Sequence, residues 1–167
     1  DSINERELRT SAHLRRAIAH LESLVPRPDL VLATGDLVER GGADEYEILR
    51  GLFASLTIPL LVIPGNHDER SALRRAFADC SYLPRDGFLQ YVVDDYPLRL
   101  IGLDTVVPGE PGGEMCAARL SWLDARLGEA PERPTLWFMH HPPYASGLEV
   151  MDGMGLSGRE AFSDFVK

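Results

Sequence analysis

Residues 60–68 read Leu-Leu-Val-Ile-Pro-Gly-Asn-His-Asp, a short apolar run that stops at a proline and a glycine. An apolar run of this length, bounded by residues that break regular structure, is typical of a buried strand. Residues 30–36, Leu-Val-Leu-Ala-Thr-Gly-Asp, repeat the pattern, and residues 135–139 form a third run that ends just before His140. The sequence therefore predicts three buried strands, each followed by polar side chains.

The stretches between these runs carry apolar residues at helical spacing. From Ser11 the helical pattern continues to Val25 and stops at Pro26. Ser157 and Glu160 form a capping-box pattern that predicts a last helix. Further helices are expected over residues 46–56, 73–77 and 120–127, and an antiparallel hairpin over residues 88–93 and 98–103. Strands that alternate with helices indicate an α/β fold with parallel strands.

Composition limits the choice of partners and compartment. The 167 residues are 44% hydrophobic, which is enough for one domain over residues 1–167. The formal net charge of -9 repels polyanions, so we expect no nucleic acid polymer as partner. Cys80 and Cys116 lie far apart and suggest neither a disulfide framework nor a zinc knuckle. The sequence has no long apolar run and no signal-peptide pattern, so we expect a cytoplasmic protein without membrane contact.

Three of the predicted strands end in side chains that can bind a metal ion: Asp36, Asn66 and His140. Ligands of open α/β sheets bind outside the carboxyl ends of the strands, so we expect these residues at the same edge of one sheet. Each alone could be a turn residue or a core histidine. Together, a carboxylate, an amide oxygen and an imidazole favour a hydrolytic centre with two metal ions.

Three motifs resemble the central motifs of the calcineurin-like metallophosphoesterases: Gly35-Asp36, Gly65-Asn66-His67-Asp68 and His140-His141-Pro142. Together with Leu103-Asp104-Thr105 and Pro143, they are most similar to the bacterial branch of class III cyclic nucleotide phosphodiesterases and glycerophosphodiesterases. The resemblance implies a four-layer αββα sandwich and hydrolysis of a small phosphodiester, a cyclic nucleotide or a glycerophosphodiester, by a metal-bridging hydroxide. A homo-oligomer is compatible with it.

The resemblance also implies roles for individual residues. Asp36 would bridge two divalent ions, which could be iron, manganese, zinc or cobalt, and Asn66 and His140 would bind the second of them. His67 would contact the phosphate and assist the leaving group. Asp68 and His141 would either support the ligands or face the substrate.

Two motifs of that family, Asp-x-His after an opening strand and a late Gly-His-x-His, do not occur in the sequence. We therefore expect an incomplete copy of a longer protein, without the opening strand and the C-terminal part, that does not hold a binuclear centre by itself. Residues 35–41 also resemble the phosphoprotein phosphatases, although Pro64 and Asp68 replace residues typical of those enzymes. A phosphomonoester phosphatase and a non-catalytic binding module remain as alternatives.

Overall fold

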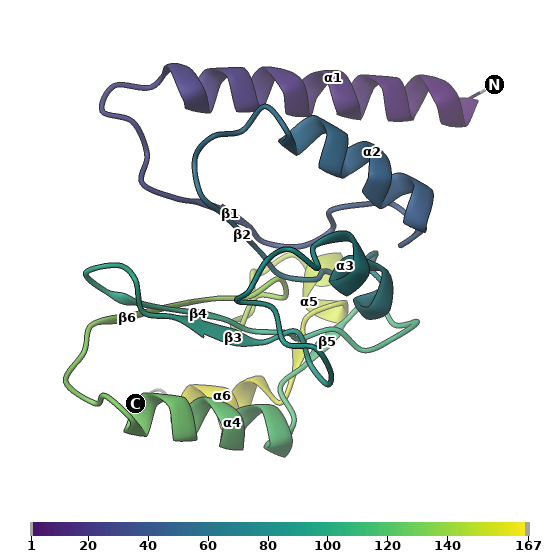
Figure 1. Ribbon diagram of the computed structural model, residues 1–167. Coiled ribbons are helices and arrows are strands. Elements are labelled where there is room, and N and C mark those ends of the chain that lie inside the picture. Colours follow the sequence, from purple (N-terminus) through teal and green to yellow (C-terminus); the bar gives the residue numbers. More distant parts are fainter. Residues whose placement is uncertain (1, 166–167) are drawn as a thin grey trace.

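The computed structural model describes residues 2–165, with side chains from residue 9 onward, and shows an α/β architecture in four layers. Figure 1 shows helices α1 and α2 above a small sheet, a second sheet below it, and helices α4 and α6 underneath. The predicted α/β class and the order of an αββα sandwich are confirmed.

In its described residues, the first half of the chain forms three helices and a pair of parallel strands, and one of the helices connects the two strands. Helix α1 (Ser2–Ser23) precedes β1 (Val31–Ala33), and α2 (Ala43–Phe53) connects β1 to β2 (Leu60–Val62), which is followed by α3 (Arg70–Ala76). The two strands pair in parallel. Because both strands run in the same direction, the loops that follow them emerge at the same edge.

The second sheet contains β3 (Tyr91–Val93), β4 (Arg99–Gly102) and β6 (Thr135–Phe138) in the order β3-β4-β6. Strands β3 and β4 form the predicted antiparallel hairpin, and β6 lies parallel to β4. A further small sheet pairs β5 (Gly113–Glu114) with β7 (Leu156–Ser157). Gly113 of this third sheet lies directly against the ring of His141.

The remaining helices belong to the second half of the chain: α4 (Ala117–Gly128), α5 (Glu149–Gly153) and α6 (Arg159–Phe165). Leu123 of α4 and Phe162 of α6 are buried with Ile101 of β4 in one apolar cluster. Within the described part of the chain, no helix combines the length and the apolar character that crossing a bilayer requires.

The two larger sheets pack face to face around Tyr91. Its hydroxyl donates to the carbonyl of Val62 at 2.7 Å, which joins β3 to β2 across the layer. A Cβ at Gly102 would lie 2.8 Å from the Tyr91 ring and 2.9 Å from Ile63, so only glycine fits at this point of β4. These contacts bring the ends of strands from different sheets close together.

Three expectations from the sequence were wrong. Helix α1 begins at Ser2 rather than Ser11, because good helix formers continue the helix beyond its apolar face. The strands that precede Asp36 and His140 belong to different sheets, since β6 pairs with β4 rather than with β1. Ser157 pairs with Glu114 in β7, and α6 begins at Arg159, so Ser157 does not form the predicted capping box.

Candidate metal centre

Two glycines allow the loops of the site to approach one another. Gly35 and Asp36 have φ angles of 100° and 51°, both in the left-handed region that costs a side-chain-bearing residue free energy. A Cβ at Gly35 would lie 2.6 Å from Nδ1 of His140, and one at Gly65 would lie 2.2 Å from Oδ1 of Asp36. The turn after β1 therefore needs glycine both in its own sequence and in the loop it faces.

Asp36, Asn66 and His140, the three predicted metal ligands, lie together. Nε2 of His140 is 3.2 Å from Oδ1 of Asn66 and 3.4 Å from Oδ1 of Asp36. Nδ1 of the same ring lies 2.9 Å from the carbonyl oxygen of Thr34, which can only accept a hydrogen bond. Nδ1 therefore carries a proton, and in the neutral ring the lone pair of Nε2 points toward the two oxygens.

This donor set fits a divalent cation. An imidazole nitrogen, an amide oxygen and a carboxylate oxygen are all acceptors, and a positive ion between them removes their mutual repulsion. A carbonyl that accepts from the other ring nitrogen is the usual partner of a metal-binding histidine. Among the described residues, however, no group of three or more His, Cys, Asp or Glu side chains comes together. The trio, with Asn66 as its third member, would thus supply only part of a ligand set.

His67, the predicted catalytic residue, lies beside Asp36. Its backbone N–H donates to Oδ1 of Asp36 at 3.1 Å, and its Nδ1 lies 2.7 Å from the carbonyl oxygen of Glu39. The hydrogen bond to that carbonyl raises the pKa of His67, against the opposing effect of partial burial. The ring is exposed, and Nδ1 is engaged by the backbone carbonyl of Glu39. Nε2 is therefore the ring atom that remains available to a substrate.

Asp68 is buried, and protein groups occupy both of its oxygens. Oδ2 accepts from the backbone N–H of Leu37 at 3.1 Å and of Gly65 at 2.8 Å, while Oδ1 accepts from the hydroxyl of Tyr46 at 2.7 Å. Burial raises the pKa of Asp68 even though these three donors favour the ionised form. Of its two predicted roles, these contacts favour support: the carboxylate joins the loop of Asp36 to the loop of Asn66.

His141 is buried next to His140, with ring centroids 4.8 Å apart and nearly perpendicular planes. Nε2 lies 3.3 Å from the carbonyl oxygen of Pro111, and Nδ1 lies 2.7 Å from the hydroxyl of Thr105. Burial lowers the pKa of His141, and the neighbouring His140 adds to the effect. In the neutral ring Nε2–H therefore donates to Pro111 and Nδ1 accepts from Thr105, a geometry that favours support over substrate contact.

Sequence reasoning missed several residues that hold the site. Tyr46 was predicted only as part of an apolar helix face, and nothing in the spacing connects it to Asp68. Asp104 was noticed as part of a motif, but its partner Arg70, at 2.6 Å from Oδ2, carried no signal. These contacts join residues more than twenty positions apart, so local pattern does not reveal them.

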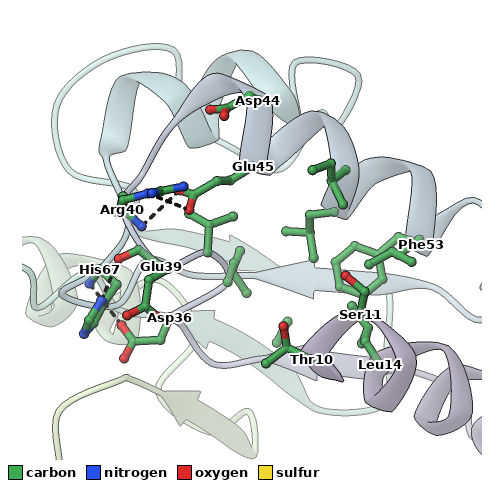
Figure 2. A pocket seen from close by; sticks show the side chains of 16 residues that line it. Thr10, Ser11, Leu14, Asp36, Glu39, Arg40, Asp44, Glu45, Phe53 and His67 are labelled. Carbon is green, nitrogen blue, oxygen red and sulfur yellow. Dashed lines mark hydrogen bonds and ion pairs between the residues drawn. The ribbon is translucent and has the colours of Figure 1, made fainter. Parts of the chain in front are cut away.

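A cleft of about 480 Å³ lies between α1, β1 and α2 and reaches the site. Figure 2 shows Asp36, Glu39 and His67 grouped at one end, and Leu14 and Phe53 at the other. Arg40 is turned toward Glu45, with Nε and Oε1 3.2 Å apart. The cleft is acidic where it meets the candidate ligands and apolar where the two helices face each other.

Comparison with known proteins points to the family whose motifs the sequence resembles. The sequence profile of the family described as calcineurin-like phosphoesterase matches residues 10–165. A probable glycerophosphodiester phosphodiesterase of Arcobacter nitrofigilis is 38% identical over 154 residues, which cover 92% of this chain and 56% of that protein. A 3',5'-cyclic adenosine monophosphate phosphodiesterase of Pseudomonas aeruginosa is 34% identical over 157 residues, which cover 94% and 56% of the two chains.

A glycerophosphodiester phosphodiesterase of Enterobacter lignolyticus is 36% identical over 137 residues, covering 81% of this chain and 49% of that protein. The chain thus spans about half the length of these curated relatives. With its α/β layers, its converging strand-end side chains and a profile match over nearly its whole length, the chain belongs to the calcineurin-like phosphoesterase family.

Proposed function

We propose that the protein is a metal-dependent phosphodiesterase that hydrolyses small phosphodiesters, with glycerophosphodiesters and 3',5'-cyclic nucleotides as the two candidate substrates. The observation that carries the proposal is the convergence of Asp36, Asn66 and His140 through Nε2 of the histidine, at 3.2 and 3.4 Å. The names of the relatives, which are phosphodiesterases of these two kinds, support the choice of a diester.

Calcineurin-like phosphoesterases depend on metal ions, and we propose two divalent ions for the complete site. Asp36, with its side chain 39% exposed, would be shared between them, and Asn66 and His140 would hold the second. When bound, such ions supply Lewis-acid charge neutralisation at the phosphoryl group and lower the pKa of water. Iron, manganese, zinc and cobalt all suit this mixture of nitrogen and oxygen ligands.

The chain's own residues then orient the phosphodiester. Nδ1–H of His67 donates to the carbonyl of Glu39, so Nε2 carries a proton only in the imidazolium form, which the raised pKa favours. In that form Nε2 can donate to a phosphoryl oxygen or to the departing alkoxide. Asp68 and His141 would hold the ligand loops rather than touch substrate, because protein atoms already occupy their polar atoms. Binding and proton donation therefore fall to residues on different loops.

The test is hydrolysis of bis(p-nitrophenyl) phosphate with added Mn²⁺, combined with metal analysis, for the full-length parent protein and for this 167-residue chain. We expect metal-dependent activity in the parent, and its loss in Asp36→Asn. The matched control is Asp124→Asn, an exposed carboxylate on α4 in the opposite outer layer, which should keep both activity and metal.

The same experiment separates the alternatives. Faster turnover of p-nitrophenyl phosphate than of the diester would favour a phosphomonoester phosphatase. A parent protein without metal and without activity toward either compound would favour a binding module. An Asp36→Asn variant with full metal content and activity would refute the proposed centre.

A further inference from the structure

Asp104 lies just beyond β4 and is fully buried. Its carboxylate forms a bidentate pair with Arg70, Nε to Oδ2 at 2.6 Å and Nη2 to Oδ1 at 2.8 Å. The backbone N–H groups of Leu89 and Val106 complete its hydrogen bonds at 2.7 and 3.0 Å. Arg70 is the first residue of α3, so this pair fixes the helix that directly follows the loop of Asn66.

Thr105, the next residue, is also fully buried but serves the other loop. Its hydroxyl lies 2.7 Å from Nδ1 of His141, and its carbonyl accepts from the N–H of Glu114 at 2.8 Å. His141 in turn packs edge to face against His140 at 4.8 Å. A Cβ at Gly113 would lie 2.4 Å from the His141 ring, so the ring is enclosed on that side as well.

We propose that Asp104 and Thr105 are a pair of positioning residues that set the separation of Asn66 and His140 by holding one ligand loop each. The inference rests on the proposed metal site and adds to it residues that touch neither ion nor substrate. The two loops leave different sheets, so no ladder of backbone hydrogen bonds fixes their distance. Two adjacent residues that bond in different directions supply that constraint.

Thr105 positions the loop of His140 through the tautomer and orientation of His140 and His141. The Thr105 hydroxyl donates to Nδ1 of His141, which leaves the Nε2 proton for the carbonyl of Pro111. Without the hydroxyl, Nδ1 of the buried His141 ring loses its hydrogen-bond partner, and the longer 3.3 Å hydrogen bond to Pro111 is left to orient the ring. The rings of His140 and His141 pack edge to face. A reoriented His141 ring should therefore also weaken the hydrogen bond between Nδ1 of His140 and the carbonyl of Thr34.

The experiment compares Thr105→Val with Thr105→Ser in the metal-free chain, by long-range ¹H–¹⁵N spectra that report which ring nitrogen carries the proton. The wild type should show Nδ1–H for His140 and Nε2–H for His141. Thr105→Val keeps the shape and removes the hydroxyl, so both patterns should become mixtures, and Thr105→Ser should restore them. The matched control is Thr135→Val, at the far end of β6, whose hydroxyl bonds only the carbonyl of Arg133 among the described residues.

Mn²⁺ titration calorimetry of the same variants, made in the full-length parent protein, provides the second readout. Loss of a residue that orients metal ligands typically weakens binding between about 10-fold and 100-fold, and we expect this for Thr105→Val but not for Thr105→Ser or Thr135→Val. Arg70→Lys tests the positioning role of Asp104, and it keeps the proposal testable if Thr105→Val does not fold. It keeps the charge but loses the bidentate fork, so Mn²⁺ binding should weaken in the same range.

The outcomes separate this inference from the proposed function. A His140 pattern in folded Thr105→Val that equals the wild type overturns the positioning role of Thr105, and unchanged Mn²⁺ affinity in Arg70→Lys overturns that of Asp104. A wild-type full-length parent protein that binds no Mn²⁺ overturns the metal site instead, and the proton positions on the two rings then still test Thr105.

Discussion

The two ends of strand β4 each carry an arginine–aspartate pair, and the pairs differ in which partner is buried. Before the strand, Asp94 has a side chain 44% exposed, and its partner Arg99 is 5% exposed. After the strand, Asp104 is 0% exposed and its partner Arg70 is 16% exposed. The end that approaches the candidate site buries the carboxylate, whereas the distant end leaves it to solvent.

The two carboxylates differ in whether water can replace a lost protein partner. Asp94 can exchange protein contacts for water and shares its oxygens with Arg133 as well, at 3.0 Å. Asp104 is out of reach of solvent, so water cannot replace any of the four N–H donors that surround its carboxylate. A buried charge that loses its partner costs much more than an exposed one. The comparison therefore predicts a steep gradient of mutational cost along one short strand.

The largest effect is expected for Asp104→Asn. Removing the charge leaves the Arg70 guanidinium without its buried counterion, and the loss in free energy of unfolding should be about 3 to 5 kcal/mol. Urea denaturation followed by circular dichroism measures it. A loss no greater than that of Asp94→Asn would break the comparison.

An intermediate effect is expected for Arg99→Met. The arginine side chain is buried and also donates to the carbonyl of Arg126 at the end of α4, so its removal takes away charged hydrogen bonds. Methionine replaces much of the apolar volume. The free energy of unfolding should fall by about 2 kcal/mol in the same urea experiment. A result as large as that of Asp104→Asn would show that burial of the arginine matters as much as burial of the carboxylate.

A small effect is expected for Asp94→Asn. Asp94 is 44% exposed, so water solvates and screens its carboxylate, and the buried Arg99 keeps its hydrogen bond to the carbonyl of Arg126 when Asp94 is replaced; the loss should be about 1 kcal/mol. The loss should shrink further in high salt, which weakens exposed pairs but has less effect on buried ones. Measuring Asp94→Asn and Asp104→Asn at low and high salt sharpens the contrast between the two ends. Equal salt dependence would contradict it.

The smallest signal is the pH dependence of the Asp94 pair. The hydrogen bond from Arg99 lowers the pKa of Asp94 below its ordinary value of 3.8, with the charges of Arg99 and Arg133 assisting. A lowered carboxyl pKa contributes stability above the unfolded-state pKa, and this contribution is lost as pH falls through the folded-state value. The difference in unfolding free energy between wild type and Asp94→Asn should thus be full near neutrality and shrink below about pH 4. A difference that grows with acidity would contradict this assignment.

Much of the fold could be predicted from local pattern. Apolar runs bounded by breakers gave β1, β2 and β6, and the hairpin of β3 and β4 followed from its two runs and polar turn. Strands β5 and β7 were missed because each is two residues long and exists only through pairing across some forty residues. The short α5 was missed as well, since its five residues bury no apolar face.

For the candidate site, the sequence determined which side chains end the strands: Asp36, Asn66 and His140. Glycines beside them and apolar runs before them were enough to predict that they meet. Only the tertiary structure decided how they meet, from two different sheets, and which residues hold them there. Strand periodicity is a local property that neighbouring residues fix, whereas the contacts of Asp68, Asp104 and Thr105 depend on which layers pack together, and packing is a property of the whole chain.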